Sequence, residues 1–172
     1  MPSAESLTMV VLGIDPGTAS TGYGVVSFEG SRLRARDHGV IETSPSAAVE
    51  LRLSEIHAQV SELVDLHSPE TIAIEQLYFG ANVRTAFAVG QARGVVLLAA
   101  GQRGIGARSY TPQQVKAAVC GRGRAEKQQV GSMAARLLAL DPSSLDEHAA
   151  DALAVAICEI NRAPLASALV GR

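Results

Sequence analysis

Residues 10–26, VVLGIDPGTASTGYGVV, limit what this chain of 172 residues can fold into more than any other stretch. An apolar run from Val10 to Ile14 predicts a buried strand, and a second strand follows after the short segment PGTAST. Strands joined by so short a connection pair antiparallel. The first strand nevertheless ends in an acid, Asp15, among four glycines at positions 13, 17, 22 and 24. Because glycine has no side chain, we expect these positions to let a bound ligand come close to Asp15.

The remaining pattern predicts one α/β domain. Strands are expected at residues 9–15, 21–28, 33–41, 71–75 and 107–111, and helices at 46–66, 82–104, 112–119, 126–140 and 144–160. The first three strands are close in sequence, which predicts an antiparallel meander. Asn82 is expected to cap its helix, and Ser144 with Glu147 forms a capping-box pattern for the last one. Gly90 and Gly94 lie four residues apart on one helical face, which allows close packing against a neighbour.

Both ends of the chain are expected to lie outside this domain. Residues 1–8, MPSAESLT, are polar and lack the basic-then-apolar order of a signal peptide, so we expect a disordered extension there. The domain is expected over residues 9–162, with 163–172 as a C-terminal tail. No apolar run reaches the roughly 18 residues of a membrane helix. Cys120 and Cys158 lack a metal-ligand spacing, and we expect two reduced thiols in a cytoplasmic protein with no membrane partner.

Positive charge is concentrated in one part of a chain whose net charge is −2. Residues 103–136 hold seven basic residues, including both lysines of the chain, Lys116 and Lys127, against a single acid, Glu126, which leaves a local charge of +6. A basic face on an acidic body is typical of proteins that bind polyanions. The alternative is a solvated helical face without a partner.

Three acids stand at positions where the pattern predicts burial. Asp15 and Glu75 each end an apolar strand, and Asp151 lies among Ala, Leu, Val and Ile in EHAADALAVAIC. A buried carboxylate needs a cation or a hydrogen-bonding partner, so a helix cap or an arginine partner is the alternative to a metal. His148 precedes Asp151 by three residues and shares its helical face. Taken alone, His148 is equally compatible with a core or capping histidine.

Together, Asp15, Glu75, His148 and Asp151 predict a metal site. Oxygen-rich ligand sets suit Mg²⁺ or Mn²⁺, and one imidazole favours Mn²⁺. The set suits two ions side by side, an arrangement that stabilises both the attacking and the leaving oxygen of a phosphodiester.

Five stretches resemble the RuvC family of Holliday junction resolvases, which belongs to the RNase H-like superfamily. The resemblance covers about residues 9–162, and the stretches read GIDPGTASTGYGVV, AIEQLYF, GQARG, TPQQVKAAVCGRGRAEKQQV and HAADALAVAIC. The resemblance implies an RNase H-like α/β fold with a mixed five-stranded sheet, three antiparallel strands then parallel strands, flanked by helices. It also implies a homodimer that resolves four-way DNA junctions in homologous recombination and DNA repair, by paired symmetric nicks and metal-assisted hydrolysis. The branch-migration proteins RuvA and RuvB are implied as partners, and the glycines around Asp15 would admit a phosphate and the DNA backbone.

The resemblance also implies roles for single residues. Asp15, Glu75 and Asp151 match the family's catalytic, metal-binding acids. His148 stands where the family usually has an aspartate, and it either binds the metal or acts as a general base. Asp146 is a nearby carboxylate that could substitute for the missing aspartate. It lies two positions before His148, however, and residues two apart on a helix do not share a face.

For DNA binding, the resemblance implies that Tyr78 stacks on a base near the crossover, while a core position is the alternative for this ring and for Phe79. Lys116 and Lys127 match basic residues that the family places beside the scissile phosphate. Arg84, Arg122 and Arg124 are candidates for contacts with the DNA backbone, which would make binding weaken steeply with salt.

Two other functions fit parts of the sequence. GIDPGT also resembles the phosphate loop of sugar kinases and other actin-like ATPases, but that class needs two such domains and a second glycine-rich loop, for which 172 residues leave no room. A DNA-binding scaffold that has lost catalysis fits the departure at His148.

Overall fold

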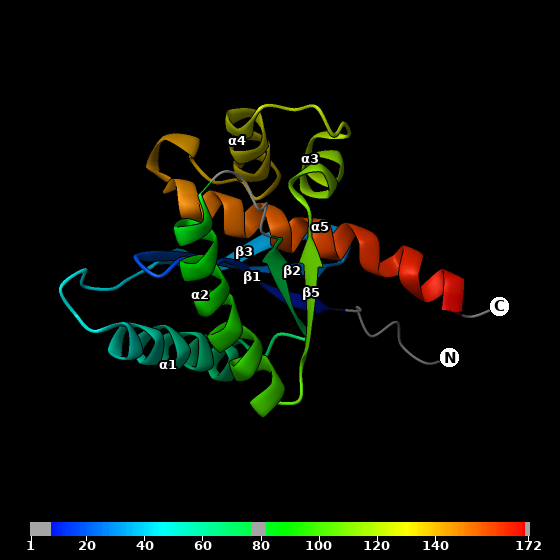
Figure 1. Ribbon diagram of the computed structural model, residues 1–172. Coiled ribbons are helices and arrows are strands. Elements are labelled where there is room, and N and C mark those ends of the chain that lie inside the picture. Colours follow the sequence, from blue (N-terminus) through cyan, green and yellow to red (C-terminus); the bar gives the residue numbers. More distant parts are fainter. Residues whose placement is uncertain (1–7, 77–81, 171–172) are drawn as a thin grey trace.

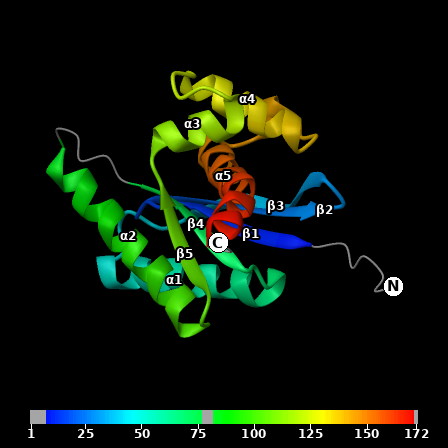
Figure 2. The same ribbon diagram turned by 90° about the vertical axis from the view of Figure 1, so that its right-hand side faces the viewer.

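The computed structural model of the chain describes residues 8–76 and 82–170, and Figures 1 and 2 show it from two sides. Its elements, in chain order, are β1 (Met9–Asp15), β2 (Ser20–Glu29), β3 (Arg32–Glu42), α1 (Val49–His67), β4 (Thr71–Glu75), α2 (Val83–Gln102), β5 (Gly106–Tyr110), α3 (Pro112–Cys120), α4 (Lys127–Leu137), the 3-10 turn η1 (Pro142–Ser144) and α5 (Glu147–Val170).

The five strands form one mixed sheet in the order β3-β2-β1-β4-β5. The pairs β1–β2 and β2–β3 are antiparallel, as the short connections predict. The pairs β1–β4 and β4–β5 are parallel, and the connections between these strands contain helices. This is the RNase H-like arrangement, so the predicted sheet is confirmed.

Helices cover both faces of the sheet, and strand alternation decides which residues each face receives. In β1, Val10, Leu12 and Ile14 point towards α1 and α2, where they join one apolar cluster. Val11 points to the other face and joins a second cluster with α3, α4 and α5. Figure 2 shows these helices above the sheet and α1 and α2 below it. Because successive side chains alternate, Asp15 belongs to the α5 face of the sheet.

Glycines on this face let α5 lie directly against the strands. A Cβ atom on Gly13 would stand 1.9 Å from the carbonyl oxygen of Ala152, and one on Gly22 would stand 2.1 Å from that of His148. A Cβ on Gly17 would meet Ser20 of its own loop, at 2.4 Å. At Gly13 and Gly22, α5 occupies the space that a side chain would need, so the expectation that these two glycines make room for a ligand is wrong.

Most element boundaries agree with the sequence, and the differences have local causes. α4 ends at Leu137 rather than near 140, because the backbone turns left-handed at Ala139 (φ 56°). The predicted capping box with Ser144 does not form. The Asp146 carboxylate caps α5 instead, accepting hydrogen bonds from the backbone N–H groups of His148 (2.8 Å) and Ala149 (3.4 Å).

The last helix extends beyond its predicted end, whereas most of the predicted N-terminal extension lies outside the described residues. α5 continues to Val170, ten residues beyond the predicted end, although this stretch contains Pro164. Of the predicted N-terminal extension, only Thr8 is among the described residues. Asn82 caps α2 as predicted, accepting from the N–H group of Thr85. Both cysteines are free thiols, as expected.

α2 alone has the length and apolar composition of a helix that could cross a membrane, within the described part of the chain. One side of it packs into the core through Ala92, Val96 and Ala99, which are fully buried. Its other side is exposed, with Val83, Phe87 and Leu98 among the exposed apolar side chains.

Candidate active site

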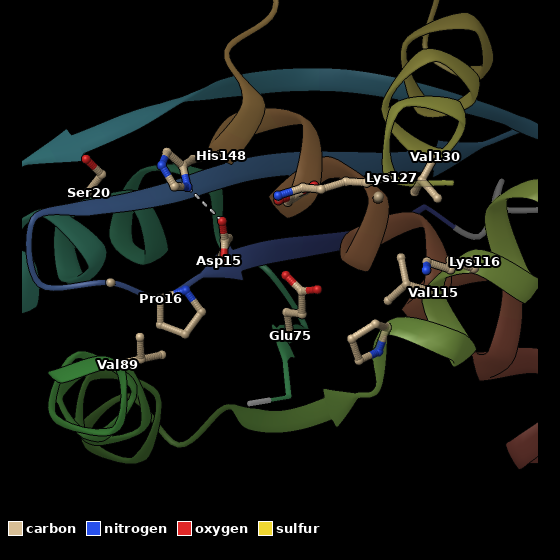
Figure 3. A pocket seen from close by; sticks show the side chains of 14 residues that line it. Asp15, Pro16, Ser20, Glu75, Val89, Val115, Lys116, Lys127, Val130 and His148 are labelled. Atoms are coloured by element: carbon tan, nitrogen blue, oxygen red, sulfur yellow. Dashed lines mark hydrogen bonds and ion pairs between the residues drawn. The ribbon is translucent and has the colours of Figure 1, made fainter. Parts of the chain in front are cut away.

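Three carboxylates from separate parts of the chain meet at one edge of the sheet. Asp15 ends β1, Glu75 ends β4, and Asp151 lies in the second turn of α5. One oxygen from each can be chosen so that all lie within 4.8 Å of one another. In Figure 3, Asp15 and Glu75 approach each other from neighbouring strands. The sequence prediction that these three acids belong together is consistent with this geometry.

Strand register explains how the chain brings the three acids together. β1 and β4 run parallel, and Ile14 pairs with Ile74, so the residues that follow, Asp15 and Glu75, end adjacent strands at the same level. Gly13 and Ala73, which pair with each other, stand two residues before Asp15 and Glu75, respectively. Both are small and face α5, as the two acids do. The close approach of α5 to this side then places Asp151 above them.

His148 also reaches this site, but through Asp15. Its Nδ1 atom lies 3.0 Å from Oδ2 of Asp15 (Figure 3). The imidazole is about half exposed, whereas the Asp15 side chain is 19% exposed. Among the described residues, the group that meets the geometric criterion for a metal site contains the three carboxylates without His148. The hydrogen bond leaves the Nε2 atom of His148 available for other chemistry.

Lys127, the first residue of α4, adds a cation to the edge of the site. Its Nζ atom lies 2.6 Å from a carboxylate oxygen of Glu147 and 3.1 Å from Oδ2 of Asp151. Glu147 and Asp151 are four residues apart on α5, so they share a helical face, and both form ion pairs with the ammonium group of Lys127. Sequence reasoning assigned Glu147 only a capping role, although this spacing was visible.

Burial and mutual repulsion change the pKa values of the acids. Burial raises the pKa of Glu75 to about 7, against an ordinary value of 4.5, and repulsion by Asp15 and Asp151 adds to this effect. Burial also raises the pKa of Asp15 and of Asp151, although the hydrogen bonds from His148 and Lys127, respectively, oppose the change. The hydrogen bond to Asp15 in turn raises the pKa of His148. The ionised forms of all three acids are therefore costly in the metal-free site, mainly because the carboxylates are buried.

The acids line a cleft of about 490 Å³. Lys116 from α3 and Lys127 from α4 line it too, which places both lysines of the chain beside the carboxylates. Pro16 from the β1–β2 turn, Ser20 at the start of β2 and Val89 from α2 also line it. The sequence drew attention to the segment that contains Pro16 and Ser20, but it did not single out Val89, whose surroundings resemble those of any helix position.

The predicted DNA-binding arginines do not line the cleft. Arg84, Arg122 and Arg124 are exposed and are not among the residues that line the cleft. Tyr78 and Phe79 lie outside the described residues.

The basic segment 103–136 does not form one uniform face. Arg103 makes two hydrogen bonds to Asp65, of 2.7 and 2.8 Å, and Arg108 faces the buried Glu159 at 3.8 Å. These two arginines are held by acids away from the cleft. Lys116 and Lys127 line the cleft, although Lys127 is also paired there with Glu147 and Asp151. The +6 of the sequence thus overstates the charge that is free to bind a polyanion.

Comparison with known proteins identifies the family. The family model described as "Crossover junction endodeoxyribonuclease RuvC" matches residues 11–159. The chain belongs to the RuvC family. Relatives named crossover junction endodeoxyribonuclease RuvC include one from Heliobacterium modesticaldum, 49% identical over 87% of this chain and 93% of its own length. Another, from Rubrobacter xylanophilus, is 50% identical over 87% of this chain and 83% of its own length.

Solved structures agree with this assignment. Thermus thermophilus RuvC superposes with a TM-score of 0.86 at 38% identity, over 92% of this chain and 97% of that one. The same protein in complex with a Holliday junction substrate gives a TM-score of 0.87. As a member of the RuvC family, this chain is an endonuclease that resolves Holliday junctions in recombination.

Proposed function

We propose that Asp15, Glu75 and Asp151 bind divalent cations, two Mg²⁺ or Mn²⁺ ions per site, and that this RuvC-family chain cuts junction strands there. The observation that carries the proposal is that three carboxylates lining one cleft each offer an oxygen within 4.8 Å of the others. Carboxylate oxygens are the ligands these hard cations prefer.

The charge balance of the site fits such ions. Without a cation, burial raises the pKa of Glu75 to about 7, and repulsion by Asp15 and Asp151 adds to the effect. A divalent cation among the three oxygens would offset these effects and favour the ionised form of each acid. Bound ions would supply Lewis acidity to the attacking and leaving oxygens of the phosphodiester.

The remaining cleft residues have complementary roles. Lys116 and Lys127 would hold the phosphate of the strand to be cut, because their ammonium groups provide positive charge at the cleft wall. His148 donates from Nδ1 to Asp15 when that nitrogen carries the proton, and its Nε2 is then left to accept the proton of the attacking water or to bind a cation. Arg84, Arg122 and Arg124 would contact the DNA backbone outside the cleft, and Tyr78 would stack on a base.

A homodimer is required for two symmetric cuts, and α2 offers a face for it. Val83 and Phe87 are 80% and 69% exposed, and Leu97 and Leu98 are exposed further along the helix. Between them, Gly90 and Gly94 have open space where a Cβ atom would stand. Exposed apolar side chains around small residues allow two helices to approach closely.

The wider setting follows from the substrate. We propose that the homodimer acts in the cytoplasm, in recombination and DNA repair, on junctions handled by the branch-migration proteins RuvA and RuvB. The named relatives are bacterial, and bacterial DNA lies in the cytoplasm.

The test is cleavage of a labelled four-way junction beside a linear duplex of the same sequence, with Mg²⁺ or Mn²⁺. We expect paired symmetric nicks with ligatable 5′-phosphates on the junction and none on the duplex. Tight junction binding without cleavage in either metal would contradict the proposal and identify a scaffold that has lost catalysis.

A further inference from the structure

The turn between β1 and β2, residues 16–19, directly follows Asp15 and forms part of the cleft. Pro16 and Gly17 of the turn line the cleft, as does Ser20, where β2 begins. The position of the Asp15 carboxylate therefore depends on the shape of this turn as well as on β1.

One set of hydrogen bonds closes the turn from inside. The Thr21 hydroxyl, fully buried, donates to the carbonyl of Gly17 at 2.6 Å and lies 3.3 Å from its N–H group. This pairing fixes the part of the turn nearest Asp15.

A second set reaches the turn from outside, from residues that do not line the cleft. The Thr43 hydroxyl, after β3, donates to the carbonyl of Thr18 at 2.5 Å. Its backbone N–H donates to the carbonyl of Ala19 at 3.1 Å. The Nε atom of Arg52, in the first turn of α1, donates to the same Thr43 hydroxyl at 2.9 Å. A chain of contacts thus runs from Arg52 through Thr43 to the turn.

The arrangement of donors makes Thr43 depend on Arg52. A hydroxyl has one hydrogen to donate, and Arg52 can only donate. Because Arg52 supplies the donor, the single hydrogen of Thr43 is directed at Thr18. Thr43 is 7% exposed, so water has little access to replace this bond.

We propose that Thr43 and Arg52 are positioning residues for the metal site, which hold the 16–19 turn so that Asp15 stays within reach of Glu75 and Asp151. This inference rests on the proposed role of Asp15 as a metal ligand. Neither residue touches the reacting atoms; both act through the turn.

Calorimetric titration of Mn²⁺ into the full-length, DNA-free protein tests the proposal without relying on cleavage. We expect Thr43→Val, which keeps the side-chain shape and loses the hydroxyl, to weaken Mn²⁺ binding about 3- to 10-fold. Arg52→Met should weaken it in the same direction. The double variant should be little weaker than Thr43→Val, because both changes break one chain of contacts. Thr43→Ser keeps the hydroxyl and should restore binding close to wild type.

Arg36→Met is the matched control, since Arg36 on β3 is also a hydrogen-bonded arginine but pairs with Glu29. It should bind Mn²⁺ as the wild type does. Junction affinity measured without metal should stay unchanged in all these variants. If Thr43→Val binds Mn²⁺ like the wild type, or if Arg52→Met weakens junction binding but leaves Mn²⁺ binding unchanged, the proposal is overturned.

Asp15→Asn in the same titration separates this inference from the proposed site. If Asp15→Asn binds Mn²⁺ with wild-type affinity, both the proposed metal site and the positioning role of Thr43 and Arg52 are wrong. If Asp15→Asn loses binding and Thr43→Val does not, the positioning role alone is wrong.

Discussion

Glu75 is the residue of the site whose charge responds most to its surroundings. With its pKa at about 7, the side chain holds a proton below that pH in the metal-free protein, and a cation must displace the proton to bind. We therefore expect Mn²⁺ affinity to rise by up to tenfold per pH unit from pH 5.5 to about 7 and to level off above. Titration calorimetry across this range checks the expectation, and affinity that does not change with pH would contradict it.

The same pKa has a consequence for folding. Between the ordinary value of 4.5 and about 7, the folded protein binds more protons at Glu75 than the unfolded chain does. The contribution of this group to stability is therefore present at the low end of that window and is lost as pH rises through it. Thermal unfolding with a chelator present should show this contribution, which Glu75→Gln removes from the pH dependence.

His148 separates two roles that the sequence left open, ligand and general base. His148→Asp replaces an imidazole with a carboxylate, which is a harder ligand, so we expect the ratio of cleavage rates in Mg²⁺ and Mn²⁺ to move towards Mg²⁺. The measurement is junction cleavage in each metal for both proteins. An unchanged ratio would show that His148 does not bind the metal.

At the scale of elements, the packing of α5 on β1 and β2 determines the site. In Gly13→Ala the new Cβ would lie 1.9 Å from a backbone oxygen of α5, so the helix has to move. We expect a loss of about 3 kcal/mol or more in the free energy of unfolding, because overpacking against backbone finds little relief. Chemical denaturation measures it.

Gly101→Ala serves as the matched control, since Gly101 lies in α2 and has nothing within 4 Å of a Cβ. It should stabilise the protein by about 0.5–1 kcal/mol, the usual gain in a helix. Equal unfolding free energies for the two variants would refute the packing account of Gly13.

The elements also show how far the sequence predicts this protein. Apolar runs of period two or near four revealed the strands and helices, and the acids at the strand ends revealed the site, since each signal lies within a few consecutive residues. The close packing of α5 against Gly13 and Gly22 could not be predicted from the sequence, because α5 lies more than 120 residues further along the chain. The spacing of Glu147 and Asp151 was visible in the sequence, but Lys127 and the Thr43–Arg52 contacts were missed, because these partners become neighbours only in the folded chain.

At the scale of the whole molecule, paired cutting depends on two copies of the chain. Phe87→Glu places a charge on the exposed apolar face of α2, where two copies would repel each other. We expect light scattering at micromolar concentration to change from a dimeric to a monomeric mass, with paired nicks lost. Leu66→Glu, an equally exposed position on α1, is the control and should remain dimeric. A monomeric wild type would contradict the dimer.

The central claim is that three carboxylates, rather than the rest of the cleft, carry out strand cleavage. The most direct measurement is single-turnover cleavage of a labelled four-way junction by Asp15→Asn and by Glu75→Gln, with junction affinity measured on the same samples. Each change removes one negative charge with little change of shape, so we expect cleavage to fall at least 1,000-fold, on the order of 4 kcal/mol, while junction binding remains. Cleavage by either variant at near the wild-type rate would contradict the account.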